Sequence, residues 1–320
     1  MKASLLYNIP PPEGKLNGVA VDANSPGVAP FTFHAQHGFA KSEVAPHTLT
    51  GFSPCTTPVQ LTLHNARTVL HPPKLPTHGF QLLIAPRATL PLNVRDDPHA
   101  IRELYSEAEE IARVAFPDAV TATAFNHVYR ISGRGASTKP RHTEGVSSPS
   151  YMVHSDSTDA SWPSRLRELV SGGEWALAGP SHLSPAQGKE LASSHRVVVL
   201  NLWRLVANFK QPSPSQLAVC DMRSVSMRSA LPYHFVVDGF IGWNYGLNKD
   251  SAAEHDWYYY PELAADEVIA FKAYDSKHEA SGGREYCFHA AFDDPTAPVD
   301  CAPRESVEIR VALAFAPQHE

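Results

Sequence analysis

A histidine and an aspartate two positions apart, His154 and Asp156, are the pair of side chains best suited to hold a metal ion. In an extended strand both would point to one side, because side chains alternate between faces. An imidazole and a carboxylate make up two thirds of the two-histidine, one-carboxylate set that holds non-haem Fe(II). The alternative is a surface strand with two polar side chains. A competing pair, His142 and Glu144, lies in a loop at 132–149, where strand alternation is not guaranteed.

A second histidine must complete this set. With 17 His and 33 Asp plus Glu in 320 residues, chance alone accounts for about two His-x-Asp/Glu pairs. His289 is the candidate, because it is the one imidazole in the apolar run 286–292, which is typical of a buried strand. The alternative is a core histidine without a ligand. Rival histidines are His195, His234, His255 and His278, the last two among charged residues and expected at the surface.

Arg304 lies fifteen positions after His289, and Arg304 and Ser306 would share one face of the last strand. A guanidinium can grip a carboxylate with two hydrogen bonds, and a nearby hydroxyl can add a third. These residues could therefore bind a co-substrate that has a distal carboxylate and chelates the metal with its other end. Arg310 falls on the same face and is a second candidate for this clamp. The alternative for either arginine is an ion pair with Glu305 or Glu308.

A substrate carboxylate could be bound by His127, Arg130 or Arg204. His127 and Arg130, with Asn126, are the polar members of a strand expected at 119–131, where they would line a pocket or face water. Arg204 ends the β-branched run that starts at residue 196.

Composition excludes several classes of protein. The net charge is −6 and the basic residues are scattered, which argues against a nucleic-acid partner. No apolar run approaches the length of a membrane span, and early prolines interrupt the N-terminal apolar patch, so neither a membrane segment nor a signal peptide is expected. The four cysteines (Cys55, Cys220, Cys287 and Cys301) form no CxxC pair and are expected to be free thiols. These features predict a cytoplasmic protein.

The elements that would position these residues are mostly strands. One clear helix starts at Asp97 and Pro98, shows apolar spacing from Ile101 to Ala112, and ends at Phe116–Pro117. Short helices are expected at 162–170 and 184–192. Strands are expected at 59–63, 79–84, 119–131, 196–204, 216–220, 233–241, 267–274, 286–292 and 306–315. The 28 prolines and the many short strands favour a β-sandwich or barrel, and no phosphate-binding glycine loop is present.

The order His-x-Asp, distant His, then Arg-x-Ser resembles Fe(II)/2-oxoglutarate-dependent oxygenases. More closely, the chain is similar to the fungal and bacterial hydroxylase/desaturase family that includes the aspergillic acid pathway oxygenase, a cephamycin 7α-hydroxylation protein and gibberellin GA4 desaturase-like proteins. The resemblance covers the C-terminal half well and the N-terminal half loosely. The matching stretches are 197–204 (VVVLNLWR), 217–225 (LAVCDMRSV), 257–276 (WYYYPELAADEVIAFKAYDS) and 288–310 (FHAAFDDPTAPVDCAPRESVEIR).

The resemblance implies a mainly β protein with a distorted double-stranded β-helix (a cupin-like jelly roll), flanking helices and an irregular N-terminal segment. It implies Fe(II), 2-oxoglutarate and O2 as cofactor and co-substrates, with hydroxylation, desaturation or oxidative cyclisation of a small-molecule substrate, which we expect to be an amino-acid-derived secondary-metabolite precursor. We expect one oxygenase domain over 1–320, with an N-terminal extension and supporting helix at 1–118, a core at 119–316 and an insertion at about 161–195. Two departures are Leu205, where the family often has proline, and the long spacing from Asp156 to His289. The alternatives are a non-catalytic cupin-like binding protein and a zinc hydrolase with the same triad.

Overall fold

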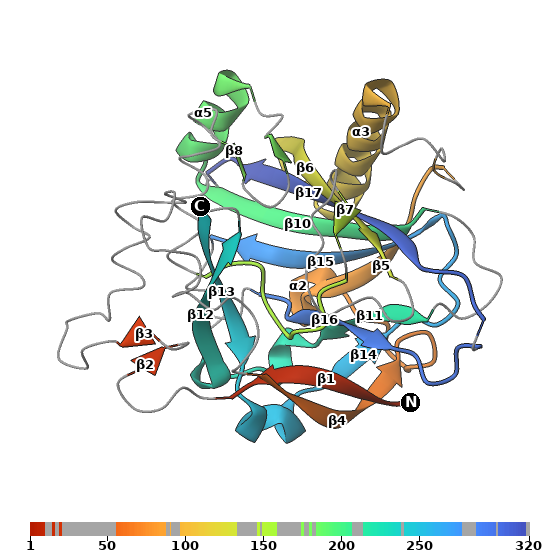
Figure 1. Cartoon of the computed structure of the whole chain (residues 1–320). Helices are drawn as coiled ribbons and strands as arrows, with labels where there is room; N and C mark the ends of the chain where they lie inside the picture. Colours follow the sequence, from red (N-terminus) through yellow and green to blue (C-terminus); the bar gives the residue numbers. More distant parts are fainter. Residues whose placement is uncertain are drawn as a thin grey trace.

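Two facing sheets dominate the computed structural model (Figure 1). The structure describes residues 1–9, 15–16, 19–20, 56–87, 90, 97–132, 146–147, 149–158, 174–175, 179–180, 184–206, 214–237, 240–276, 286–298 and 300–317. The expected helix at 162–170, the pair His142 and Glu144, and residues Cys55 and His278 lie outside them.

The larger sheet has six strands in the order β5-β15-β10-β17-β6-β7. Its members are β5 (Phe80–Ile84), β6 (Thr121–Ile131), β7 (Val146–Ser147), β10 (Arg196–Leu205), β15 (Glu267–Asp275) and β17 (Glu305–Phe315). The three central strands β10, β15 and β17 are almost entirely buried, as their mostly apolar sequences predict.

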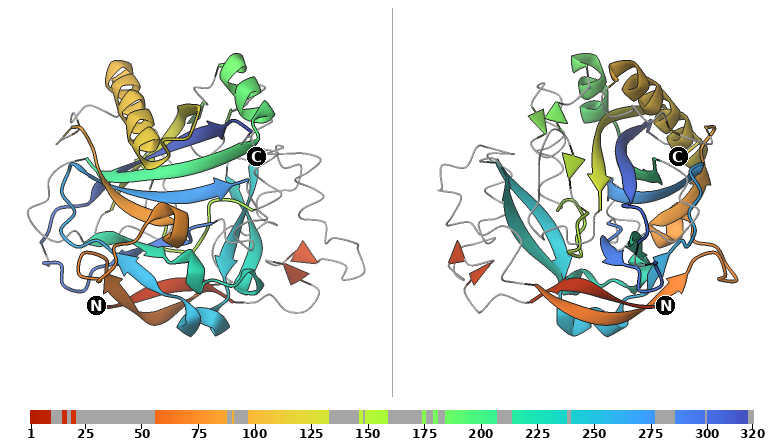
Figure 2. Two further views of the ribbon diagram at one scale, coloured as in Figure 1. Left: turned by 180° about the vertical axis from the view of Figure 1, so that it is seen from behind. Right: turned by 45° about the vertical axis from the view of Figure 1, so that its right-hand side comes forward.

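The smaller sheet has five strands in the order β1-β4-β14-β11-β16. Its members are β1 (Lys2–Asn8), β4 (Thr56–Asn65), β11 (Ser215–Cys220), β14 (Trp257–Tyr259) and β16 (His289–Asp293). Figure 2 shows this sheet facing the larger one, with β1 and β4 on the side far from the helices. The architecture confirms the predicted mainly β jelly roll. Lys2–Asn8 form a regular edge strand, although the N-terminal segment was expected to be irregular.

Helix α3 (Pro98–Ala115) covers the outer face of the larger sheet (Figure 1). Asp97 caps it by accepting a hydrogen bond from the backbone N–H of His99, as predicted. Its buried stripe, which includes Leu104, Ala108 and Ile111, packs against outward-facing apolar side chains of β10 and β17. Helix α5 (Pro185–Ser193) lies above the same sheet and begins with a Ser184–Gln187 capping box, which confirms the second predicted short helix.

Smaller elements complete the described chain. Strands β12 (Ala230–Val237) and β13 (Phe240–Leu247) form a hairpin, so the single strand expected at 233–241 is wrong. The remaining elements are β2 (Lys15–Leu16), β3 (Val19–Ala20), β8 (Glu174–Trp175), β9 (Gly179–Pro180), α2 (Leu75–His78) and the 3-10 turns η1 (Met222–Ser224), η2 (Met227–Ser229) and η3 (Lys249–Glu254). No helix among the described residues is long and apolar enough to cross a membrane.

Candidate metal centre

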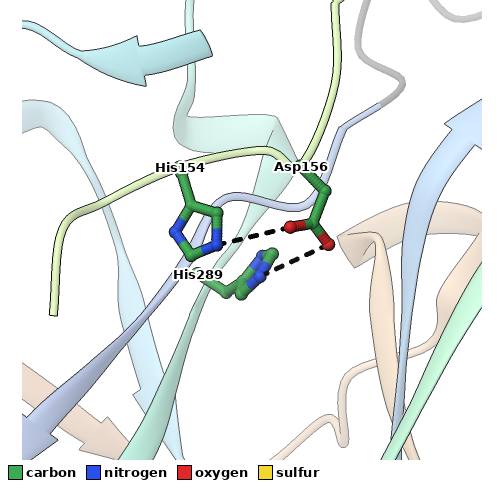
Figure 3. Close-up of side chains that lie close together, drawn as sticks. All are labelled: His154, Asp156 and His289. Carbon is green, nitrogen blue, oxygen red and sulfur yellow. Dashed lines mark ion pairs between the residues drawn. The ribbon is translucent and has the colours of Figure 1, made fainter. Parts of the chain in front are cut away.

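The structure brings His154, Asp156 and His289 together between the two sheets. One candidate ligand atom from each residue lies within 4.8 Å of the others. His154 Nε2 is 3.4 Å from Asp156 Oδ1, and His289 Nε2 is 3.7 Å from Asp156 Oδ2 (Figure 3). Adjacent ligand atoms that lie about 2.1 Å from a shared ion are roughly 3 Å apart, and both distances to the carboxylate are within about 1 Å of that value.

The two histidines are joined through their backbones, although they are far apart in the chain. The backbone N–H of His154 donates to the carbonyl of His289 at 3.1 Å, and the N–H of His289 donates to the carbonyl of His154 at 3.0 Å. This isolated bridge sets the two rings side by side, with centroids 4.3 Å apart. The phenyl ring of Phe271, from the larger sheet, packs against His289 at 4.6 Å.

Hydrogen bonds determine which nitrogen of each imidazole can bind a metal. His154 Nδ1 donates to the Met152 carbonyl at 2.7 Å, and His289 Nδ1 donates to the Cys287 carbonyl at 3.1 Å. A carbonyl oxygen can only accept, so Nδ1 carries the proton in both rings. Burial, followed by the neighbouring His154, lowers the pKa of His289 to about 3. His289 is therefore neutral near pH 7, and its Nε2 lone pair faces the carboxylate.

Asp156 reaches this point by a turn rather than by strand alternation. Its φ of 65° lies in the left-handed region, which aspartate tolerates better than most residues. Met152 and His154 form only isolated bridges, so the expected regular strand at this motif is absent from the described residues 149–158. Burial alone would raise the pKa of the Asp156 carboxyl, but the charge of Arg310 holds that pKa well below its usual range. The donor set is thus two imidazole Nε2 atoms and one carboxylate, which fits Fe(II).

Arg304, which directly precedes β17, and Arg310, which lies on β17, share one face by alternation but have different partners. Arg310 Nη2 is 2.7 Å from Glu308 Oε1 and 3.4 Å from Asp156 Oδ2. Arg304 is 2 % exposed, and among the described residues its guanidinium donates two long hydrogen bonds, both 3.3 Å, to the carbonyl and hydroxyl of Ser215. Within the described ranges, no carboxylate is paired with Arg304.

The region around Arg304 has unused polar capacity. Arg304 Nε and Ser306 Oγ are buried and have no hydrogen-bond partner among the described residues. The guanidinium lies over the Trp203 ring at 5.3 Å. Burial, and then the charge of Arg130, lowers the pKa of Arg304 from 12.5 to about 10. A buried cation without a counter-ion is costly, so this pocket would favour an anionic ligand.

The three candidate substrate residues are placed differently. His127 lies on the outer face of β6 and its Nδ1 is 2.9 Å from the Tyr105 hydroxyl on α3. Arg204 also faces outward, where it pairs with Glu107 of α3 at 3.2 Å. Neither reaches the metal centre. Arg130 pairs in register with Ser306, and its positive charge lowers the pKa of both His289 and Arg304. Of the three candidates, it is therefore the one near the metal centre.

Two of the rival histidines, His195 and His255, have described side chains, and neither is part of the cluster. His255 is 6 % exposed, so the expectation that it lies at the surface is wrong. It is 3.0 Å from the Tyr7 hydroxyl and 3.3 Å from the Ser229 hydroxyl, within a buried hydrogen-bond chain. His195 precedes β10, and His234 lies on β12. Among the described residues, the triad is the only group of this kind that could hold a metal ion.

Sequence reasoning missed Asn201, which touches the cluster. Its Nδ2 donates to Asp156 Oδ2 at 2.6 Å. The available signal was a single amide within the apolar run of β10.

The sequence matches the family model described as oxidoreductase/YMDC permease-like domain over residues 22–315. Aspirochlorine biosynthesis protein N of Aspergillus oryzae is 32% identical over 122 residues, which cover 38% of this chain and 49% of the relative. Hydroxylase/desaturase efuI of Hormonema carpetanum is 31% identical over 134 residues, covering 38% of this chain and 41% of the relative. The chain therefore spans about half the length of these curated relatives, or less.

A longer match joins the chain to the Fe(II)/2-oxoglutarate-dependent dioxygenase nvfI of Aspergillus novofumigatus. The two are 27% identical over 260 residues, which cover 79% of this chain and 82% of the relative. The solved structure of the iron and alpha-ketoglutarate-dependent endoperoxidase NvfI superposes with a TM-score of 0.68 at 20% identity, covering 99% of this chain and 98% of that one. At this identity, the structural likeness concerns the fold.

Proposed function

We infer the function from the premise that this chain belongs to the oxidoreductase/YMDC permease-like domain family, whose model spans residues 22–315. The hydroxylase/desaturase and Fe(II)/2-oxoglutarate dioxygenase relatives confirm the resemblance found in the sequence. The proposed function is that of a non-haem Fe(II)/2-oxoglutarate-dependent oxygenase that oxidises a C–H bond of a small secondary-metabolite precursor. We treat residues 1–320 as a single oxygenase domain.

The observation that carries this proposal is the arrangement of two Nε2 lone pairs and one ionised carboxylate in a buried cluster. His154, Asp156 and His289 would hold the metal, and their backbone contacts prepare the site before binding. When bound, Fe(II) with 2-oxoglutarate and O2 supplies the oxidising power that removes hydrogen from an unactivated C–H bond, while 2-oxoglutarate becomes succinate and CO2.

Arg304 and Ser306 are proposed to bind the distal carboxylate of 2-oxoglutarate. The guanidinium of Arg304 gains a counter-ion, and two buried polar atoms gain partners. Arg310 is assigned to the metal centre instead, since Glu308 and Asp156 already engage it. Arg130 is the remaining candidate for a substrate carboxylate, as expected for an amino-acid-derived precursor.

Succinate release tests the function without knowledge of the substrate. The purified chain, with Fe(II), 2-oxoglutarate and air, should release succinate slowly, because such enzymes turn over part of their co-substrate uncoupled. His154→Ala, Asp156→Ala and His289→Ala should each reduce this release to background. His64→Ala is the matched control, because His64 is an exposed residue that packs against the Tyr258 ring, and its loss should leave the rate unchanged.

Three outcomes would contradict the proposal. Unchanged succinate release in one triad variant removes that residue from the metal site. Binding of metal and 2-oxoglutarate without any succinate indicates a binding protein. Hydrolytic activity supported by Zn(II) in the absence of O2 indicates a zinc hydrolase.

A further inference from the structure

A row of polar side chains crosses the centre of the larger sheet. Asn126, Arg310 and Asn201 are direct neighbours in register on β6, β17 and β10, and Phe271 on β15 continues the row. Directly paired residues share a face, so this row faces the metal centre. The three polar residues are at most 5 % exposed. Burial of polar groups costs free energy unless they are bonded, so their presence needs a specific reason.

Asp156 is that reason, because two members of the row contact the same oxygen of its carboxylate. Asn201 Nδ2 donates to Asp156 Oδ2 at 2.6 Å, and Arg310 Nη2 donates to it at 3.4 Å. The same Nη2 of Arg310 also donates to Glu308 Oε1 at 2.7 Å. The shorter contact is that of Asn201, while Arg310, held by Glu308, places a positive charge beside the carboxylate.

The sheet is irregular at this point. The register between β10 and β15 shifts between Val199 and Leu200, and that between β17 and β6 shifts between Arg310 and Val311. Such bulges re-aim side chains next to active sites. Here the two shifts flank Asn201 and Arg310.

Asp156 needs this support because its own backbone gives it little. With φ at 65°, it has no regular strand around it. Its neighbour Ser155 is fixed to Tyr245 by two hydrogen bonds of 3.0 and 3.1 Å, which hold the backbone but leave the direction of the Asp156 carboxylate undetermined.

We propose that Asn201, backed by the Arg310–Glu308 pair, is a positioning residue that engages Oδ2 of Asp156 so that Oδ1 is the oxygen offered to the metal. The inference rests on the proposed function, since it concerns one ligand of the proposed metal site. A carboxylate that binds through a single oxygen occupies one coordination position and leaves the others for 2-oxoglutarate and O2. Loss of Asn201 would let the carboxylate of Asp156 rotate, so that Oδ1 would no longer be the preferred oxygen for the metal.

The test measures Mn(II) binding to the metal-depleted full chain by isothermal titration calorimetry. Asn201→Ala and Asn201→Leu remove the donor, the first with and the second without a large loss of volume. Both should weaken Mn(II) binding by about 10–100-fold, the usual effect of removing a group that orients a ligand. Asn65→Ala is the control, because Asn65 caps a surface turn, and it should bind Mn(II) like the wild type.

A second readout separates positioning from general damage. The two Asn201 variants should lower kcat for succinate release while the KM for 2-oxoglutarate, set by the distant Arg304, changes by less than about threefold. Thermal unfolding of the metal-depleted variants checks that they are folded.

The outcomes distinguish the two proposals. If the wild type binds Mn(II), His154→Ala does not, and both Asn201 variants bind like the wild type, the positioning role is overturned and the metal site stands. If only Asn201→Ala is weakened, lost volume rather than a lost donor is responsible, and the inference is also overturned. If the wild type itself does not bind, the proposed function fails and the inference falls with it.

Discussion

Replacing Arg304 by methionine should stabilise the protein while removing its response to 2-oxoglutarate. Burial and the charge of Arg130 lower the pKa of Arg304 from 12.5 to about 10. Each unit of such a shift corresponds to about 1.4 kcal/mol, so the charged guanidinium costs about 3 kcal/mol near pH 7. A neutral side chain of similar length would avoid that cost.

Some favourable contacts would be lost with the guanidinium. The two 3.3 Å hydrogen bonds to Ser215 contribute about 0.5 kcal/mol each, and the contact with the Trp203 ring contributes about 0.5–1 kcal/mol. The net expectation for Arg304→Met is a rise of about 1–2 kcal/mol in the free energy of unfolding. At saturating 2-oxoglutarate the wild type should gain about 3 kcal/mol from ligand binding, and the variant should gain nothing.

Thermal and urea unfolding of the metal-loaded protein, with and without 2-oxoglutarate, measure both effects. Arg204→Met is the matched control, because Arg204 is equally buried but paired with Glu107 at 3.2 Å. Breaking that pair should destabilise the protein by about 3–5 kcal/mol. If Arg304→Met destabilised the protein as Arg204→Met does, or still responded to 2-oxoglutarate, the assignment of Arg304 as an anion site would be refuted.

Two further predictions concern stability. Burial lowers the pKa of His255 from 6.5 to about 4, so the unfolded chain binds the proton more readily than the folded chain. This residue should therefore lower the free energy of unfolding by about 2 kcal/mol as pH drops from 7 to 4.5. Urea titrations should show that His255→Gln lacks this part of the loss, and a variant with the same pH dependence as the wild type would contradict the buried neutral state. A Cβ at Gly246 would overlap the buried side chain of Asn8, so Gly246→Ala should lower the free energy of unfolding by about 1–3 kcal/mol. Thermal unfolding of the double variant with Asn8→Ala should show that part of this stability is recovered. If the stability losses of the two single variants simply add in the double variant, the overlap is contradicted.

Sequence patterns within an element, such as a helix cap or regular apolar spacing, correctly predicted the helices and strands that carry them. Helix α3 has an Asp–Pro start and a continuous apolar stripe, and both are seen in the structure. The strands around Arg196–Leu205 and Glu305–Phe315 are dense in β-branched residues and were predicted to within two residues. Strand β1 has no such signal, because its pairing with β4 depends on residues more than fifty positions away.

The site was predictable in residue type but not in detail. Alternation places Arg304 and Arg310 on one face, so the sequence could not tell which of them would be paired with a carboxylate. In the structure Arg310 is paired with Glu308, whereas Arg304 donates to the carbonyl of Ser215. The same alternation, applied to β6, would have placed His127 opposite Asn126 and Arg130 and removed it from the pocket. The left-handed backbone of Asp156 could not be read from its neighbours, since Ser-Asp-Ser has no glycine to mark it.

The reciprocal backbone bridge between His154 and His289 has a consequence for how this scaffold can diverge. Backbone N–H and carbonyl groups, which every residue type except proline supplies, set the distance between the two imidazoles. Segments that connect the two histidines in the chain can therefore lengthen, shorten or change composition without altering that distance. Descendants of such a scaffold could exchange their connecting loops, and with them the molecules they admit, while the spacing of the two rings is inherited unchanged.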